Sequence, residues 1–280
     1  MYSLPVHVSN ALTIDVEDWY HVCGLADSPV IGRDQRRVRQ AVERILTILS
    51  RSGVKATFFV LGSVAEEEPE LVPMIAREGH EIASHGWSHK LVHQLSEQEF
   101  RAEIRRTGEI LKAQGGKQPV GFRAPQWSVS RSSPPWIFSI LQEEGYRYDS
   151  SMNPLPFVGD RRGERRPFQL ETGRGLVEFP PLVLQTIVGN LPVGGGWGFR
   201  FFPLAMVREA VKRMNRAGDP AVLYLHPREV DPGGPRLRLP PLKKFAAYGT
   251  RTDATERVGR LLREFQFTTL ERLVSTWHSV

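Results

Sequence analysis

The sequence predicts an α/β fold in which crossover helices connect parallel strands. Strand-like apolar segments alternate with amphipathic helical segments along the 280 residues, and this alternation is typical of parallel pairing with a helix between successive strands. Polar residues follow several of the strand-like segments at their carboxyl ends. In an α/β barrel such residues converge on one mouth, where these folds carry their active sites. We therefore expect an enzyme.

The N-terminal elements follow from hydrophobic patterning. Residues 11–15 are a short apolar run that predicts a buried strand. The segment 34–52 carries an apolar stripe at helical spacing, and Gly53 is placed to end this helix. The apolar run at 55–61 predicts the second strand.

The next two helices flank the third strand. A helical pattern around residues 71–75 precedes the strand expected at 81–85. Ser96 and Glu99 form a capping box, in which each side chain bonds the backbone N–H of the other. This box predicts the start of a helix that runs to about residue 114.

The C-terminal half continues the alternation. The strands expected there are 121–125, 146–150, 177–183 and 221–226, and the helices are 134–144 and 203–217. Two long segments, 152–176 and 227–250, are rich in Pro, Gly and Arg and are expected to be irregular. Loops of that length in a compact domain are usually functional or mobile, so we expect them to rim the site.

Composition excludes several classes of protein. Hydrophobic residues make up 40% and charged residues 24% of the chain, which is typical of a globular protein. The longest apolar runs fall far short of the ~20 residues that span a bilayer, so no transmembrane helix is expected. The N-terminus lacks the features of a cleavable signal. With one cysteine, Cys23, no internal disulfide can form, and both observations favour a cytoplasmic location.

The net charge of +6 has two interpretations. Arginine clusters could attract a polyanion or an anionic lipid surface, or they could reflect general surface basicity. The clusters are Arg36, Arg37 and Arg39, then Arg161, Arg162, Arg165 and Arg166, then Arg236 and Arg238. They have no interleaved aromatic pattern and match no nucleic-acid motif, so no nucleic-acid partner is expected.

A metal site is indicated by histidines and carboxylates at two strand ends. His85 and His89 are four positions apart, which lets two imidazoles turn toward one ion. Asp15, Glu17 and Asp18 crowd three carboxylates at the end of an apolar strand, and a stable fold normally needs a cation or an arginine nearby to offset their repulsion. A helix N-cap would explain Asp18 without a metal. It would not explain Asp15, which lies inside the strand pattern.

Five ordered segments resemble the polysaccharide deacetylases of the NodB-homology type, carbohydrate esterase family four. They are TIDVEDW (13–19), SHGWSH (84–89), GFRAPQWS (121–128), YDSS (148–151) and YLHPREVDP (224–232). The resemblance covers nearly the whole chain and is closest to the branch associated with exosortase and exopolysaccharide gene clusters. It implies one domain over 1–280, with a catalytic core at about 10–228 and a C-terminal extension at 229–280. The implied fold is a single distorted (β/α) barrel with about seven parallel strands.

The resemblance also implies catalytic roles. Asp15 would be the general base, and Arg123, close to Pro125 in the same motif, would keep that carboxylate ionised and oriented. His226 would be the general acid, and Asp149 would be the aspartate that pairs with it. Such a base and acid suit hydrolysis of an amide, which needs a proton removed from water and another given to the leaving amine.

The resemblance makes His85 and His89 ligands of a divalent ion, for which we expect Zn²⁺. The third ligand stays open between Glu17 and Asp18. Alternation along a strand puts Glu17 on the same face as Asp15, whereas a bulge at the strand end would bring the shorter Asp18 around. The ion would activate a water for attack on an acetamide carbonyl.

Aromatic residues beside these motifs predict a saccharide pocket. Candidate substrate contacts are Trp19, Trp87, Pro125, Trp127 and Trp197. Core packing explains any single tryptophan equally well. The glycine run 194–196 suits either close approach of a loop to a ligand or a plain turn.

We therefore expect N-deacetylation of N-acetylhexosamine units in an exopolysaccharide or its precursor. The substrate would be a polysaccharide or a lipid-linked oligosaccharide, met at the inner membrane face in peripheral contact with membrane-bound export machinery. The alternatives are a metal-independent, allantoinase-like amidohydrolase and a non-catalytic carbohydrate-binding member of an export complex. The pair His85 and His89 argues against the first alternative, and the presence of both a base and an acid argues against the second.

Overall fold

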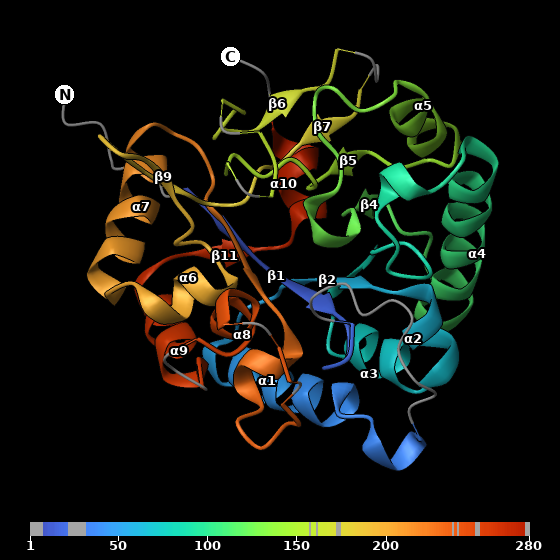
Figure 1. The fold of residues 1–280 in the computed structure, drawn as a ribbon, viewed down its shortest axis with the longest axis horizontal. Coiled ribbons are helices and arrows are strands. Elements are labelled where there is room, and N and C mark those ends of the chain that lie inside the picture. Colours follow the sequence, from blue (N-terminus) through green and yellow to red (C-terminus); the bar gives the residue numbers. More distant parts are fainter. Residues whose placement is uncertain are drawn as a thin grey trace.

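The computed structural model describes residues 8–21, 32–156, 158–160, 162–171, 175–236, 238–239, 241–249 and 253–277. Within these residues one curled sheet lies at the centre of the fold, and helices surround it (Figure 1). Its strands are β1 (Asn10–Val16), β2 (Thr57–Val60), β3 (Glu81–Ser84), β4 (Gly121–Phe122), β5 (Tyr148–Asp149), β6 (Phe168–Gln169), β7 (Val177–Glu178), β10 (Val222–Leu225) and β11 (Phe267–Thr268). Strands β8 (Leu184–Thr186) and β9 (Gly189–Leu191) form a separate hairpin.

The sheet is parallel apart from one edge. Its order is β10-β1-β2-β3-β4-β5-β7-β6, with β11 beside β1, and only β6 and β7 pair antiparallel. The carboxyl ends of the parallel strands therefore share one edge. Asp15 on β1 lies opposite Phe59 on β2, and Ser84 on β3 lies opposite Phe122 on β4. The segments that leave β1, β3 and β4 thus begin close together, which confirms the predicted α/β class.

Curling brings the segment after β7 against β10. The Leu182 N–H donates to the Val222 carbonyl at 2.8 Å, and the Tyr224 N–H donates to the Gly194 carbonyl at 2.9 Å. A Cβ on Gly194 would lie 2.3 Å from the Leu182 carbonyl oxygen. One on Gly195 would lie 2.4 Å from the Tyr224 carbonyl oxygen, so this approach of backbone to backbone requires glycine. The result is a distorted half-barrel.

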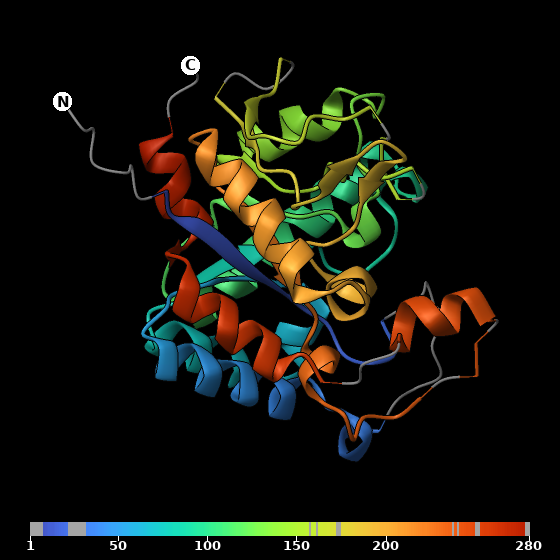
Figure 2. The same cartoon turned by 90° about the vertical axis from the view of Figure 1, so that its left-hand side faces the viewer.

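Ten helices are described around the sheet. They are α1 (Val38–Ser52), α2 (Gly62–Glu67), α3 (Leu71–Arg77), α4 (Glu97–Gly115), α5 (Trp136–Glu143), α6 (Gly196–Phe201), α7 (Leu204–Arg216), α8 (Pro241–Tyr248), α9 (Thr255–Glu264) and α10 (Leu270–Thr276). The short 3-10 turns are η1 (Arg33–Gln35), η2 (Val92–Gln94), η3 (Pro125–Trp127) and η4 (Pro227–Val230). In the described part of the chain, none of these helices has the length and apolar character needed to cross a membrane. Helix α8 projects from the body of the domain beside α6 (Figure 2).

The main core joins the sheet to helices from both ends of the chain. Ile14 of β1 and Leu223 of β10 pack in one cluster with Leu49 of α1 and Leu261 of α9, and all four side chains are buried. Burial of such side chains stabilises the fold by roughly 1.5–3 kcal/mol each. Because α9 and β11 belong to the segment 229–280, this segment completes the same core and sheet.

Several boundaries follow the predictions closely. The capping box is present: the Glu99 N–H donates to Ser96 Oγ at 3.3 Å, and the Ser96 N–H donates to Glu99 Oε2 at 2.7 Å. The helix predicted over 34–52 begins at Val38, and the residues before it form η1. Gly53 ends this helix in the left-handed conformation, with φ at 63°.

Three segments differ from the predictions, chiefly because of proline. The strand predicted over 177–183 ends at Glu178, since Pro180 and Pro181 lack the N–H that a strand ladder requires. The strand predicted over 121–125 ends at Phe122, and Pro125 begins η3. The segment 227–250, predicted to be irregular, contains η4 and α8. Helices α2 and α6 were not predicted, because six residues are too few to show helical periodicity.

Candidate metal centre and active site

A buried cluster of three potential metal ligands lies at the carboxyl edge of the sheet. Glu17 follows β1, and His85 and His89 follow β3. One ligand atom from each lies within 4.8 Å of the others, and all three residues are buried. Glu17 Oε2 is 2.7 Å from His89 Nε2. Two imidazoles and one carboxylate form a set that divalent metals bind in proteins. The triad is therefore consistent with a divalent metal site.

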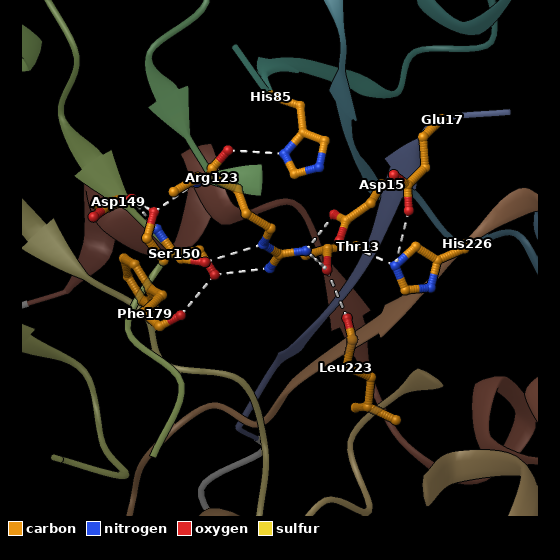
Figure 3. A network of polar contacts seen from close by, with 12 residues as sticks. Thr13, Asp15, Glu17, His85, Arg123, Asp149, Ser150, Phe179, Leu223 and His226 are labelled. Atoms are coloured by element: carbon orange, nitrogen blue, oxygen red, sulfur yellow. Dashed lines mark hydrogen bonds and ion pairs between the residues drawn. The ribbon is translucent and has the colours of Figure 1, made fainter. Parts of the chain in front are cut away.

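The tautomer of His85 suits metal ligation. Its Nδ1 lies 2.8 Å from the Arg123 carbonyl oxygen, so Nδ1–H donates to that oxygen and Nε2 keeps its lone pair (Figure 3). Burial lowers the pKa of His85 to about 4, so the ring is neutral at pH 7. Burial opposes ionisation of Glu17, but His89 and the nearby imidazoles hold the pKa of this carboxyl well below its usual range. A neutral imidazole beside a carboxylate is the state that a cation requires.

Of the two carboxylates left open by the sequence, the structure brings Glu17 to the histidines and not Asp18. Asp18 accepts backbone N–H groups at the start of α1, from Arg37 at 2.9 Å and from Val38 at 3.2 Å. It also accepts the N–H of Trp19 at 2.7 Å. The Arg37 and Val38 donors are the unpaired N–H groups of a helix N-terminus, which attract a carboxylate. Asp18 therefore has the helix-capping position.

Asp15 and Arg123 form a buried ion pair beside this cluster. Nη1 of Arg123 is 2.7 Å from Asp15 Oδ1 and also donates to Thr13 Oγ1 at 2.8 Å. Nε and Nη2 donate to the carbonyl and the hydroxyl of Ser150 at 3.0 and 2.7 Å (Figure 3). Because every nitrogen of the guanidinium is bonded, Arg123 has one orientation, and it fixes one oxygen of Asp15. Thr13 and Ser150 were not among the predicted site residues.

His226 follows β10 directly and turns its imidazole toward Asp15 and Glu17. Its Nε2 is 3.2 Å from Glu17 Oε1 and 3.8 Å from Asp15 Oδ2 (Figure 3). Glu229 lies against its other side, and Arg200 of α6 holds Glu229 with Nε 3.0 Å from Oε1. Sequence reasoning missed Glu229 and Arg200. The signal was present for Glu229, because its spacing of three from His226 repeats that of a capping box.

The predicted pairing of Asp149 with His226 is corrected by the structure. Asp149 on β5 lies opposite Glu178 on β7, and its Oδ1 accepts the Ser150 N–H at 2.8 Å and the Ser151 hydroxyl. Burial raises the pKa of Asp149 to about 6, and burial together with Asp149 raises that of Glu178 well above its usual range. Two adjacent buried carboxyls cannot both ionise, so they share a proton. The pair lies behind Arg123, since Ser150 bonds that guanidinium.

Two of the predicted tryptophans lie beside the site. Trp127 stands 4.9 Å from Tyr224, centroid to centroid, with the Arg123 guanidinium carbon 4.8 Å from its ring. Trp127 and Gln126, which follow Pro125, both have left-handed backbones, with φ at 57° and 52°. Such strain in residues other than glycine gathers at functional sites. Trp19 donates its Nε1–H to the Gln35 carbonyl at 3.0 Å.

The other two tryptophans pack against helices. Trp87 lies with its ring 3.5 Å from the Arg106 guanidinium carbon of α4, and it closes so tightly on Gly62 of α2 that a Cβ there would clash at 2.3 Å. Trp197 of α6 joins the aromatic rings of Phe201 and Phe245 at 6.2 and 5.6 Å. The structure shows these packing contacts, and substrate contact by Trp87 and Trp197 stays a prediction.

A further histidine, His21, lies beside the metal-ligand cluster. His21 was not predicted: its Nδ1 accepts the Asp18 N–H at 3.0 Å, and its ring lies 5.7 Å from that of His89. Burial lowers the pKa of His21 to about 4. Cys23 and Arg161, both noted in the sequence, lie outside the described residues.

Comparison with known proteins places this geometry in a family. Residues 27–148 match the polysaccharide deacetylase family, and residues 150–275 match a domain of unknown function, DUF3473. The segment 27–148 belongs to the polysaccharide deacetylases of the CE4, or NodB, type. The deacetylase match begins after β1 and ends at β5, and the DUF3473 match covers the remaining strands together with His226 and Glu229.

Curated relatives support the assignment over part of their length. A peptidoglycan-N-acetylglucosamine deacetylase of Bacillus cereus is 40% identical over 103 residues, which is 35% of this chain and 38% of the relative. A peptidoglycan deacetylase of Helicobacter pylori is 29% identical over 147 residues, which is 52% of this chain and 49% of the relative. The chain thus spans less than half the length of these relatives.

Solved structures support the fold. A Mycobacterium smegmatis protein assigned as a polysaccharide deacetylase has a TM-score of 0.64 at 24% identity, over 98% of this chain and 91% of that one. The Bc1960 peptidoglycan N-acetylglucosamine deacetylase has a TM-score of 0.55 at 19% identity, over 99% and 92%. These likenesses confirm the curled, mostly parallel sheet of a CE4 deacetylase.

Proposed function

We propose that this protein is a metal-dependent hydrolase that removes N-acetyl groups from N-acetylhexosamine units of an exopolysaccharide or its precursor. The observation that carries the proposal is the convergence of two kinds of group at one edge of the sheet. Glu17 and the two histidines form a ligand set, and Asp15 and His226 lie beside it with their polar atoms 3.8 Å apart. A binding module needs a ligand site but no separate base and acid, so this arrangement favours an enzyme.

The metal would be held by Glu17, His85 and His89, and we propose Zn²⁺. A nitrogen-rich set with one carboxylate suits zinc, and the hydrogen bond from His85 to a carbonyl is the outer contact that zinc-binding histidines usually make. When bound, such an ion supplies a Lewis acid and lowers the pKa of water toward ~7. This set also argues against a metal-independent, allantoinase-like amidohydrolase.

Asp15 is proposed as the general base. One oxygen is fixed by Arg123 at 2.7 Å, so the other is left to accept a proton from the water that attacks the acetamide carbonyl. Arg123 lies wholly buried beneath it and pairs with the carboxylate. The ion pair therefore orients the base.

His226 is proposed as the general acid. As the carbon–nitrogen bond of the acetamide breaks, the leaving nitrogen takes a proton from Nε2, and the products are a free amino sugar and acetate. Its imidazole faces the same opening as Asp15, and its side chain stays 16% exposed while those of Asp15 and Glu17 are 4% and 5% exposed. The acid therefore lies nearest to the entering substrate.

The site of action is proposed as the cytoplasmic face of the inner membrane. A net charge of +6 favours an acidic polymer or an anionic lipid-linked precursor, and contact with export machinery would bring the enzyme to its substrate. Fractionation of cells should find the protein with membranes at low salt and release it at high salt, because surface attraction is screened. Recovery in the soluble fraction at all salt concentrations would reject this part of the proposal.

The enzymatic proposal is tested by acetate release. The purified protein is stripped of metal, its metal content is measured, and acetate is followed on chitin oligosaccharides before and after addition of Zn²⁺. We expect no release from the stripped protein and recovery with the metal. Full activity in a verified metal-free preparation would reject the metal-dependent mechanism.

A further inference from the structure

We propose that a pocket beside the metal centre, lined by Trp19, Arg228, Arg236 and Tyr248, binds an anionic group of the saccharide. The group would be a carboxylate or a phosphate carried next to the N-acetylated sugar that reacts. This inference rests on the proposed function and adds to it the residues that would hold the charged group of the substrate. We call this pocket the arginine pocket.

The arginine pocket adjoins the site through two of its lining residues. Trp19 is two positions after Glu17, and Arg228 is two positions after His226. The pocket is small, with a volume of about 40 Å³, and Ala247 and Tyr248 of α8 contribute to its lining. A sugar whose N-acetyl group reaches Asp15 would therefore place its neighbour toward this pocket.

The charge of the lining is positive. Among its described residues the acid is Asp231, and two arginines from α1 and its start neutralise it: Arg37 Nε lies 2.7 Å from Oδ2, and Arg44 Nη1 lies 3.3 Å from Oδ1. Arg200, which also lines the pocket, is matched by Glu229. The described lining thus carries three arginines, Arg200, Arg228 and Arg236, against the acid Asp231, so an anionic ligand meets a positive field.

The lining is held in place before a ligand arrives. Arg228 donates from Nη1 to the Ala247 carbonyl at 2.8 Å, and the Arg236 guanidinium carbon lies 5.7 Å from the centre of the Tyr248 ring. Trp19 is anchored by its bond to the Gln35 carbonyl at 3.0 Å. Planar guanidinium groups bind carboxylate and phosphate through paired hydrogen bonds. Fixed aromatic rings beside them suit a sugar, whose ring stacks on such faces.

The test compares three probes that share N-acetylglucosamine. Chitin hexasaccharide is neutral, hyaluronan hexasaccharide alternates N-acetylglucosamine with a carboxylate sugar, and UDP-N-acetylglucosamine carries a diphosphate. Binding is measured by calorimetry on the Zn²⁺-loaded Asp15→Asn protein, with and without Arg228→Gln or Arg236→Gln. The matched control is Arg105→Gln, which removes the same charge from the outer face of α4.

We expect Arg236→Gln to weaken the binding affinity for an anionic probe by roughly tenfold, as loss of a charge-assisted hydrogen bond does. Chitin binding should stay unchanged, Arg236→Lys should recover part of the loss, and Arg105→Gln should have no effect. A loss with hyaluronan alone identifies a carboxylate, and a loss with UDP-N-acetylglucosamine alone identifies a phosphate. Equal losses on charged and neutral probes, or no loss on any probe, would overturn the proposal.

Failure of the proposed function is seen separately. Acetate release from chitin hexasaccharide by the wild-type holoenzyme tests deacetylation and does not require the arginine pocket. If release is absent while the anionic probe still depends on Arg236, the pocket stands and the deacetylase proposal fails. If acetate is released and charge has no influence on binding, the deacetylase proposal stands and the arginine-pocket proposal fails.

Discussion

Glu229 holds His226 from the side opposite the metal ligands. Its Oε2 accepts the His226 backbone N–H at 3.1 Å and lies 3.7 Å from Nδ1 of the imidazole. Burial lowers the pKa of His226, but Glu229, Glu17 and Asp15 outweigh that effect and raise the pKa above its usual value. In Glu229 itself, burial favours the neutral acid, yet His226 and Arg200 hold its pKa at about 2. The pair therefore presents a protonated imidazole to the opening over a wider pH range.

Replacement of Glu229 by glutamine should weaken the acid without emptying the metal site. We expect Glu229→Gln to lower kcat/KM for an acetamide roughly 10- to 100-fold, as loss of a second contact to a catalytic or metal-bound imidazole does. With the negative charge gone, the pKa of His226 falls, so its protonated form disappears at lower pH. The alkaline limb of the kcat/KM profile should therefore move to lower pH, which steady-state assays across pH measure.

Two controls accompany this variant. Glu256→Gln makes the same change on the exposed face of α9 and should leave the profile unchanged. The Zn²⁺ content of Glu229→Gln should equal that of the wild type. If its rate and pH profile match the wild type, Glu229 has no influence on His226.

Substitutions of Glu17 and of Asp18 should affect metal binding and helix capping separately. Glu17→Gln is expected to lose Zn²⁺ affinity, because Glu17 is the carboxylate that lies with His85 and His89. Asp18→Ala should retain the metal but lose about 1 kcal/mol of stability, since it removes the acceptor for the N–H groups of Arg37 and Val38. Metal analysis and denaturant unfolding provide the two readouts. The opposite pattern would make Asp18 the ligand.

Substitutions of Asp15 and of His226 should impair catalysis in different ways. Asp15→Asn should keep metal and oligosaccharide binding but lose turnover, because the amide cannot accept the proton of the attacking water. His226→Ala should slow acetamides far more than activated aryl acetates, whose leaving groups need no proton. Comparison of the two substrate types measures this difference. Equal impairment of both by His226→Ala would show that His226 is not the leaving-group acid.

The buried pair of Asp149 and Glu178 should make stability depend on pH. In the folded protein burial raises the pKa of Asp149 to about 6, and burial together with Asp149 raises the pKa of Glu178 well above its usual range. The folded state therefore binds more protons than the unfolded state above pH ~4.5. Stability from the shared proton is full below that pH and is lost as pH rises through the folded pKa values, by on the order of 1 kcal/mol per pH unit for each group.

Glu178→Gln tests this dependence. The amide can donate to Asp149 in place of the shared proton while its oxygen keeps the Met152 N–H, which Glu178 accepts at 3.0 Å. We expect the variant to be as stable as the wild type near pH 5 and more stable at pH 8, as judged from urea unfolding. The same substitution at exposed Glu143 provides the control. A constant difference at every pH would contradict a shared proton.

The sequence by itself determined the fold class and the edge at which polar residues gather. Alternating apolar patterns are local, and parallel strands with crossover helices follow from them, so the pattern alone predicts that Asp15, His85, Arg123 and His226 meet at one mouth. The structure does place these four residues together. Proline also acts locally, because it lacks a backbone N–H. Whether it ends a strand depends on which N–H groups the sheet uses, and strands β4 and β7 are therefore shorter than the sequence pattern predicted.

Only the tertiary structure decided which carboxylate serves which partner. Asp18 leaves the metal ligands because α1 begins beside the end of β1 and offers N–H groups to it. Asp149 is separated from His226 because β5 pairs with β7 across the sheet from β10. A carboxylate binds whichever donor the fold brings within about 3 Å, and residues distant in sequence supply those donors. Local patterning contains no information on that distance, so it could name the candidate groups but not pair them.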